Sequence, residues 1–258
     1  MTNEEQIRLW NEVNPRRWIA MRRPLDKALT PFGKGAMDAL SARPGEFALD
    51  VGCGFGDTTV ELARRCGRAL GVDVSQPLLE IARAEAPPGV SYLLADAQTH
   101  PFEQRFDLVF SRFGIMFFED PAAAFGNLRR AMKPGGRFAA VVWGAAGENE
   151  WVQLPLRVVR RHLPVPAPSS GPGPFSLGDP ATFSGLLSGA GFADVSLRPL
   201  DLPFEGDAAL LLQSGPVAAA LREAGAAGEA LRPILEEEIR AQMPPRLEAR
   251  ALVALAKT

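Results

Sequence analysis

The stretch Leu49-Asp50-Val51-Gly52-Cys53-Gly54-Phe55-Gly56-Asp57 decides the fold of this 258-residue chain. It continues an apolar run that begins at Phe47, and a helical pattern follows it from about Thr58 to Arg65. A glycine-rich turn between a buried strand and a helix lets the backbone approach a ligand at the helix N-terminus. We therefore expect a ligand-binding turn at the carboxyl end of this strand.

Strand and helix patterns alternate after this turn. Strands are expected at 69–74, 90–95, 106–111 and 137–143, helices at 76–86 and 121–132, and a Lys-Pro-Gly-Gly turn at 133–136. Nearly continuous apolar strands that alternate with helices are typical of a parallel sheet covered on both faces. This pattern predicts an α/β fold with a Rossmann-like doubly wound sheet, whose ligands bind beyond the carboxyl ends of the strands.

The two ends of the chain are less regular. Several short helices are expected up to Leu40, because prolines interrupt the pattern. The segment Pro164 to Pro180 is too rich in helix and strand breakers to be a regular element, and its length suits a lid or a crossing. A helix at 180–190, a strand at 192–200 and a helical stretch at 206–243 follow. Residues 247–257 fit either a helix or an antiparallel edge strand.

Composition narrows the class of protein. The length and the 47% hydrophobic content suit a single domain. A net charge of −2 and a pI near 5.8 argue against a nucleic-acid partner, and the short basic runs at 16–17, 22–23 and 160–162 are expected to be solvated helix faces. Cys53 and Cys66 form no disulfide or metal pattern. Without a leader or a membrane-spanning run, a cytoplasmic location is expected, with no membrane partner.

Acidic residues mark the ends of the first three strands, at Asp50, Asp73 and Asp96. A nicotinamide-binding fingerprint would require glycine at position 57, where this chain has Asp57. Carboxylates beside the turn suit a cation better than a pyrophosphate, which favours S-adenosylmethionine with its sulfonium and ammonium groups. Asp57 also suits a helix cap, which is the simpler role.

Two of these acids have positions that suit a nucleoside. Asp73 comes 21 positions after Gly52, the spacing at which a carboxylate accepts hydrogen bonds from both ribose hydroxyls. At the end of the third strand, the Asp96 carboxylate can accept from an adenine amino group, while the backbone N–H of Ala97 donates to the ring.

Five segments carry a resemblance to a known family: Leu49-Asp-Val-Gly-Cys-Gly-Phe-Gly, Gly71-Val-Asp-Val-Ser, Ala95-Asp-Ala-Gln, Phe106-Asp-Leu-Val-Phe-Ser and Lys133-Pro-Gly-Gly-Arg. Together they resemble the class I S-adenosylmethionine-dependent methyltransferases, in particular the subgroup like the ubiquinone and menaquinone biosynthesis enzymes. The resemblance covers about residues 43–143. It implies a seven-stranded sheet whose last strand, near 247–257, runs antiparallel to the others.

The resemblance also implies a cofactor site and a division of the chain. Asp50, Gly52 and Gly54 would contact the methionine portion, Asp73 the ribose, Asp96 and Ala97 the adenine, and the backbone at Ser111 and Arg112 the ammonium group. Val74 would be a further cofactor-binding residue. The single domain would comprise a helical cap (1–42), the cofactor-binding core (43–143), an insertion or lid (144–180) and a C-terminal part with a helical insertion (181–258).

Methyl transfer draws its driving force from the sulfonium, so the protein chiefly aligns a nucleophile and excludes water. If a general base is used, His100 is the first candidate, although it also fits a structural loop histidine. Arg112 fits either a contact to an acidic substrate or a partner for Asp107. Trp10, Trp18, Phe113 and Trp143 are expected to line the site for a small-molecule substrate carrying an O, N or C nucleophile.

Two alternatives stay open from the sequence. One is a nicotinamide-dependent oxidoreductase, which the position of the third glycine disfavours. The other is a non-catalytic S-adenosylmethionine-binding protein that keeps the fold. No metal site is expected, and the sequence does not predict the oligomeric state.

Overall fold

The computed structural model describes residues 3–103, 105–165, 171–213 and 215–258. These residues build one seven-stranded sheet with the strand order β3-β2-β1-β4-β5-β7-β6. The strands are β1 (Phe47–Val51), β2 (Arg68–Asp73), β3 (Val90–Leu94), β4 (Phe106–Arg112), β5 (Met132–Trp143), β6 (Ala193–Pro203) and β7 (Glu248–Lys257). β1 to β5 pair in parallel, whereas β7 runs antiparallel to β5 and β6. The predicted fold class is confirmed.

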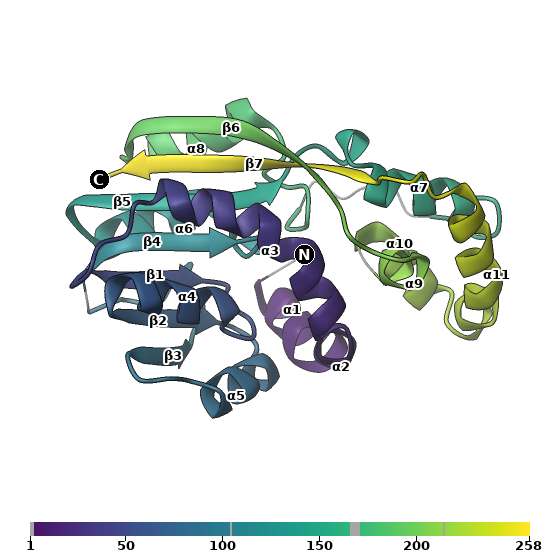
Figure 1. Cartoon of the computed structure of the whole chain (residues 1–258), viewed down its shortest axis with the longest axis horizontal. Helices are drawn as coiled ribbons and strands as arrows, with labels where there is room; N and C mark the ends of the chain where they lie inside the picture. Colours follow the sequence, from purple (N-terminus) through teal and green to yellow (C-terminus); the bar gives the residue numbers. More distant parts are fainter. Residues whose placement is uncertain (1–2, 104, 166–170, 214) are drawn as a thin grey trace.

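Helices cover both faces of the sheet (Figure 1). α3 (Arg22–Ala39) and α4 (Asp57–Cys66) lie on one face, while α6 (Pro121–Ala131) and α8 (Pro180–Gly189) lie on the other. α5 (Gln76–Ala84) packs against β3. Because the central strands are covered on both sides, their side chains are apolar almost without interruption, and Leu108, Val109 and Phe110 of β4 are fully buried.

The last strand is not at the edge of the sheet, so the prediction of an antiparallel edge strand at 247–257 was wrong in its position. β7 lies between β5 and β6, and β6 forms the edge. The side chains give the physical reason, since most of β7 is buried whereas the polar residues Asp194, Arg198 and Asp201 occupy β6. An edge strand tolerates exposed polar side chains, which an interior strand does not.

The glycine pair of the Lys-Pro-Gly-Gly segment interrupts β5 rather than preceding it. Met132 already pairs with Phe106 of β4, and the register then shifts so that Arg137 pairs with Leu108. The predicted turn at 133–136 is therefore an irregularity inside a longer strand, as glycines in strands often are.

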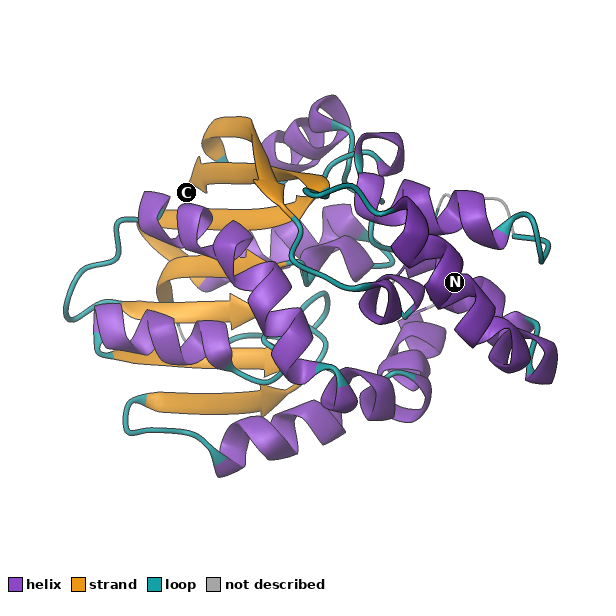
Figure 2. Cartoon of the chain, turned by 45° about the vertical axis from the view of Figure 1, so that its right-hand side comes forward, coloured by secondary structure: helices purple, strands orange, loops and turns teal. Residues whose placement is uncertain are grey.

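Helices outside the sheet layers gather at the carboxyl ends of the parallel strands (Figure 2). They are α1 (Asn3–Arg8), the π-helix η1 (Leu9–Val13), α2 (Pro15–Ala20), α7 (Glu150–Val159), α9 (Ala208–Leu212), α10 (Gly215–Glu223) and α11 (Ala226–Gln242), with the short 3₁₀ turns η2 (Ile115–Phe117) and η3 (Ala146–Glu148).

Several short N-terminal helices were predicted and are present, although Pro24 and Pro31 lie inside the 18-residue α3. The helical stretch 206–243 divides into three helices, α9 to α11. Residues 166–170 of the proline-rich segment lie outside the described residues. Of the helices that the structure describes, none is long and apolar enough to cross a membrane.

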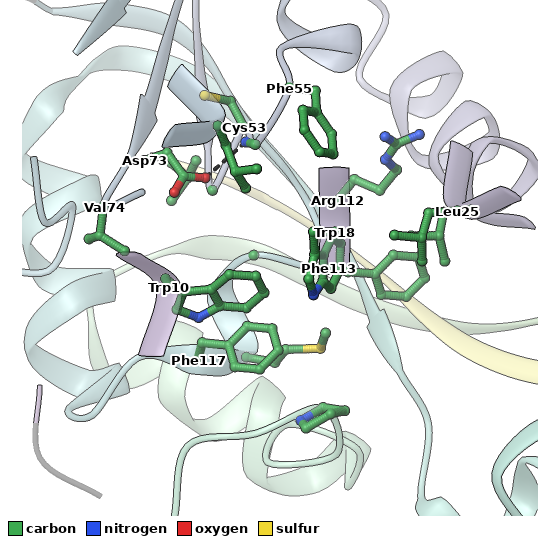
Figure 3. A pocket seen from close by; sticks show the side chains of 18 of the residues that line it. Trp10, Trp18, Leu25, Cys53, Phe55, Asp73, Val74, Arg112, Phe113 and Phe117 are labelled. Atoms are coloured by element: carbon green, nitrogen blue, oxygen red, sulfur yellow. Dashed lines mark hydrogen bonds between the residues drawn. The ribbon is translucent and has the colours of Figure 1, made fainter. Parts of the chain in front are cut away.

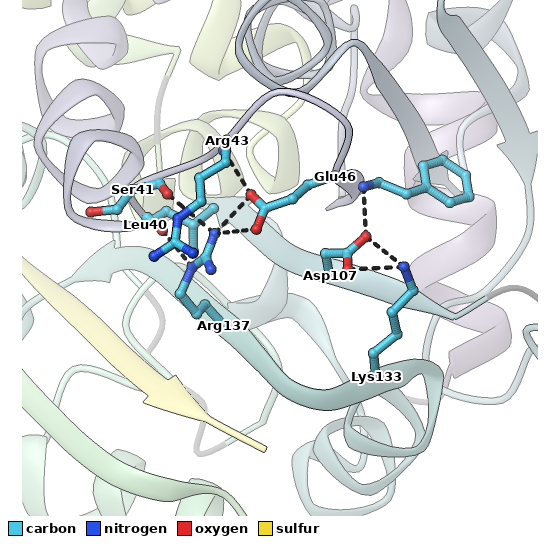
Figure 4. A network of polar contacts seen from close by, with 8 residues as sticks. Leu40, Ser41, Arg43, Glu46, Asp107, Lys133 and Arg137 are labelled. Atoms are coloured by element: carbon cyan, nitrogen blue, oxygen red, sulfur yellow. Dashed lines mark hydrogen bonds and ion pairs between the residues drawn. The ribbon is translucent and has the colours of Figure 1, made fainter.

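A polar network fixes the opposite end of the sheet (Figure 4). Arg137 of β5 donates to both carboxylate oxygens of Glu46 at 2.9 and 2.8 Å, and its Nε donates to the carbonyl of Leu40 at 2.9 Å. Lys133 pairs with Asp107 at 2.8 Å. The alternative that Asp107 anchors Arg112 is therefore wrong, because the two residues occupy opposite ends of β4.

Candidate active site

A pocket opens between the glycine-rich turn after β1 and the helices that lie outside the sheet layers (Figure 3). It brings together most of the residues predicted to bind the cofactor, and all four predicted to contact the substrate. These are Gly52, Gly54, Asp73, Val74, Asp96, Ala97 and Arg112, with Trp10, Trp18, Phe113 and Trp143. Three predicted residues, Asp50, Ser111 and His100, are not among those that line it.

The glycine turn needs two glycines for different reasons. Gly52 has φ +69°, and a Cβ there would lie 2.7 Å from the Cα of Gly114, so the loops after β1 and β4 touch at this point. Gly54 has φ +54°, and a Cβ there would meet nothing within 4 Å. Gly52 thus permits close backbone packing, whereas Gly54 borders the open space of the pocket.

Asp73 ends β2 with its carboxylate held by backbone donors. The N–H groups of Gly54 and Ser75 each donate to one of its oxygens at 2.8 Å. Burial raises the pKa of this carboxyl group above its usual value. Each carboxylate oxygen can accept a second hydrogen bond, so Asp73 retains acceptor capacity on the side facing the pocket.

The N-terminal helices are tied directly to the strand ends. Asn3 Nδ2 donates to Asp96 at 2.8 Å, and Asn11 Nδ2 donates to the carbonyl of Val74 at 2.8 Å. Asn11 Oδ1 also accepts from the backbone N–H of Gln76 at 2.9 Å. Sequence reasoning missed both asparagines, because nothing in their local pattern indicates contacts across more than 60 residues.

Asp50 lies beneath the turn rather than in the pocket lining. It is fully buried, and its Oδ2 accepts hydrogen bonds from the hydroxyls of Thr58 and Thr59 at 2.6 Å each. Its Oδ1 has no hydrogen-bond partner. Burial raises the pKa of this carboxyl group to about 6. Ser111 is also fully buried and donates to the carbonyl of Val51 at 2.7 Å, so both residues brace the strand ends from behind.

Replacing Asp50 with asparagine should change how stability depends on pH. Since the pKa of Asp50 rises from 3.8 to about 6 on folding, the folded chain binds more protons than the unfolded chain between these values. The Asp50 carboxyl group therefore contributes most to the stability of the folded chain below about pH 4. That stabilisation is lost as the pH rises through about 6.

The stability of Asp50→Asn relative to the wild type should thus rise across this range, by on the order of 3 kcal/mol. The asparagine oxygen can still accept from Thr58 and Thr59. Urea unfolding of both chains from pH 4 to 8 measures this difference, in which other titrating groups cancel. A difference that stays constant with pH contradicts the prediction.

Three side chains differ from their predicted environments. The His100 ring packs edge-on against Phe102 with centroids 5.0 Å apart, and the structure gives it no contact with the pocket. Gly56, not Asp57, caps α4, and Asp57 pairs with Arg22 at 3.2 Å. Arg17 was expected on a solvated face but lines the pocket.

Arg112 lies against α3, where a Cβ on Gly33 would come within 2.8 Å of its side chain. It donates to the hydroxyl of Thr30 at 3.1 Å, and Asp26 is 3.7 Å away.

Aromatic side chains wall the rest of the pocket in two clusters. Trp10 contacts Trp18 and Phe117 edge-on, with centroids 5.2 and 5.3 Å apart. Phe113 stacks on Trp143 at 4.1 Å and an interplanar angle of 21°. Figure 3 shows Asp73 across the pocket from Trp18 and Phe113. The pocket therefore has an acidic, backbone-rich side and an apolar aromatic side. In the described part of the chain, no group of His, Cys, Asp and Glu is arranged to hold a metal ion.

Comparison with known proteins identifies the core. Residues 49–140 match the methyltransferase domain family. An uncharacterized 37.1 kDa protein in a transposon of Streptomyces fradiae is 39% identical over 126 residues, which cover 46% of this chain and 35% of that protein. The aklanonic acid methyltransferase DauC of a Streptomyces species is 32% identical over 118 residues, covering 43% and 54% respectively. The matched regions thus span about half or less of these relatives' lengths.

A solved structure extends the likeness across the fold. Phosphoethanolamine N-methyltransferase 2 of Haemonchus contortus, crystallised with S-adenosylhomocysteine, superimposes with a TM-score of 0.57 at 19% identity. The superposition covers 88% of this chain and 52% of that one. Residues 49–140 therefore match a methyltransferase domain, and the chain has the fold of the class I S-adenosylmethionine-dependent methyltransferases. S-adenosylmethionine is the cofactor of that class, and the turn and strand-end acids described above are suited to it.

Proposed function

We propose that this chain transfers the methyl group of S-adenosylmethionine to a small molecule with an O, N or C nucleophile. One observation carries the proposal. A single pocket is lined by Gly54 and Asp73, which suit the cofactor, and by the aromatic clusters around Trp10 and Trp143, which suit an acceptor. Apolar walls exclude water and align an acceptor, which is the main duty of a methyltransferase. The named relatives, which act on aklanonic acid and on phosphoethanolamine, support a small-molecule acceptor.

The bound cofactor supplies an activated methyl group, and the residues of this chain hold and orient the reactants. Asp73 with Val74 would hold the ribose, Asp96 with Ala97 the adenine, and Gly52 with Gly54 the methionine portion. Asp50 and Ser111 would support the strand ends that bind the methionine portion, and Arg112 would lie beside it at the end of β4. We assign no general base, because His100 does not line the pocket.

Turnover tests this proposal. Purified chain with S-adenosylmethionine and a small-molecule cell extract should form S-adenosylhomocysteine, measured by mass spectrometry. S-adenosylmethionine binding without turnover would favour the non-catalytic alternative. Binding of NAD without binding of S-adenosylmethionine would favour the oxidoreductase. The cytoplasmic location and the absence of a nucleic-acid partner stay predictions from the sequence.

Ligand binding should close the N-terminal helices and the segment after β5 over the pocket. Asn3 already occupies an acceptor position of Asp96, so an adenine that bonds to this carboxylate has to displace α1 or share the oxygen with it. We expect hydrogen exchange to slow in residues 3–40 and 150–165 when S-adenosylhomocysteine is added. Exchange that is slow in both segments beforehand, and unchanged by ligand, would instead show a permanently docked cover.

A further inference from the structure

Arg17 of α2 is a cation in the pocket lining without a carboxylate partner in the described chain. Its Nη2 donates to Asn14 Oδ1 at 3.1 Å, within the same helical segment. Its Nε is buried and has no hydrogen-bond partner. Arg17 itself lines the ligand pocket, and no described carboxylate pairs with its charge, so the charge points to an anion that arrives with the ligand.

The charged groups that act on Arg17 are positive as well. Burial, together with the nearby positive charges of Arg222 in α10 and Arg232 in α11, lowers the pKa of its guanidinium to about 10. The group remains protonated at neutral pH. Arg232 pairs with Glu229 at 2.7 Å, which leaves no described acid to offset Arg17. A partly buried cation that lacks a counter-charge is disfavoured until an anion binds.

The other arginines near the pocket are already matched. Arg112 lies 3.7 Å from Asp26, and Arg22 pairs with Asp57 at 3.2 Å and with Glu85 at 2.6 Å. The unmatched positive charge therefore sits where the N-terminal helices face the C-terminal helical insertion, beside the aromatic cluster of Trp10, Trp18 and Phe117.

We propose that the methyl acceptor is an aromatic acid whose carboxylate is bound by Arg17. This inference rests on the proposed methyltransferase function and specifies its substrate class. The planar guanidinium presents its N–H donors in a fork that matches the two oxygens of a carboxylate. The aromatic cluster receives the rings of the acceptor by edge and face contacts.

The cofactor carries a carboxylate of its own, which is the rival occupant. The acceptor is favoured by position, because the turn at Gly52 and Gly54 and the loop after β4 receive the methionine portion in our assignment. Arg17 instead faces Arg222 and Arg232, which belong to the insertion between β6 and β7. The experiment must therefore measure the cofactor product and the acceptor separately.

The test uses the full chain and three variants, Arg17→Gln, Arg17→Lys and the control Arg16→Gln. Arg16 precedes Arg17 in α2 but is exposed and does not line the pocket. Calorimetry first gives the affinity for S-adenosylhomocysteine. The loaded chain is then titrated with a set of hydroxynaphthoic and hydroxybenzoic acids, each matched by its primary amide, which has the same shape without the charge.

We expect the wild type and Arg16→Gln to bind the acids at least about tenfold more tightly than the amides, as for hydrogen bonds to a charged group. Arg17→Gln should reduce this ratio to about one, with Arg17→Lys in between because it keeps the charge but loses the fork. S-adenosylhomocysteine affinity should be the same in all four chains. Unliganded Arg17→Gln should melt no lower than the wild type, since it loses an unmatched, partly buried charge.

Several results would overturn the inference. Wild-type chain that shows no preference for acids, or binds none of the probes, lacks the proposed site. A tenfold loss of S-adenosylhomocysteine affinity in Arg17→Gln with the acid preference intact would assign Arg17 to the cofactor. A lower melting temperature with the preference intact would make its role structural. Failure of the wild type to bind S-adenosylhomocysteine would instead overturn the proposed function.

Discussion

Replacing Gly52 with alanine should destabilise the chain severely. The added methyl group would lie 2.7 Å from the Cα of Gly114, a backbone atom that cannot rotate away. Position 52 also has φ +69°, a conformation that costs a residue with a Cβ about 1–3 kcal/mol. Overpacking costs a further 1–3 kcal/mol or so. Urea unfolding should therefore show a loss of about 2–6 kcal/mol.

Gly54→Ala is the matched control for this experiment. Gly54 also has a positive φ, of +54°, but a Cβ there meets no atom within 4 Å. Its stability should fall by only about 1–3 kcal/mol, the cost of the left-handed conformation alone. Its affinity for S-adenosylhomocysteine should fall clearly, because the methyl group enters the pocket. Equal losses of stability in the two variants would refute the steric argument.

Asp73→Ala should weaken S-adenosylmethionine binding by about 1.5–3 kcal/mol, or roughly ten- to a hundredfold and more. The variant removes the acceptor for ligand hydroxyls, and it also frees the N–H groups of Gly54 and Ser75 that shape the turn. Calorimetry with S-adenosylmethionine measures the effect, and the melting temperature checks that the fold survives.

Asp107→Ala provides the control for Asp73→Ala. Asp107 is also a partly buried carboxylate near a strand end, with Lys133 and the backbone N–H of Phe47 as its partners. It lies at the far end of the sheet, so its loss should lower stability and leave cofactor affinity unchanged. Unchanged affinity in Asp73→Ala would remove that residue from the cofactor site.

The local pattern of the sequence was enough to predict the sheet and its acids. Buried parallel strands read as short apolar runs, and Asp73 and Asp96 follow two such runs directly, so their arrival at one edge depends only on the strands being parallel. Trp10, Trp18, Phe113 and Trp143 were also predicted to line the pocket, whereas the other aromatic residues of its wall, such as Phe117, were not.

The environments of Asp50 and Arg17 and the position of β7 were not predicted, because they depend on packing between distant parts of the chain. Asp50 differs from Asp73 because the first turn of α4 presents the hydroxyls of Thr58 and Thr59 to it and closes it off from the pocket. Arg17 looks like a surface residue in the sequence, but it lines the same pocket as Gln213 and Gly215, more than 190 residues later. The interior place of β7 likewise depends on pairing with β5 across more than 100 residues.

The helical insertion leaves and re-enters the sheet at a single point, since Pro203 and Glu248 face each other in the β6–β7 register. α9 to α11 lie entirely between these two residues, and Gln213 and Gly215 from this segment reach the pocket wall. Such an enclosed segment can be lengthened, shortened or replaced at little cost in chain entropy, because neighbouring strands already hold its ends together. One side of the pocket can therefore change in evolution by replacement of this insertion, without disturbing the strands that present Asp73 and Asp96.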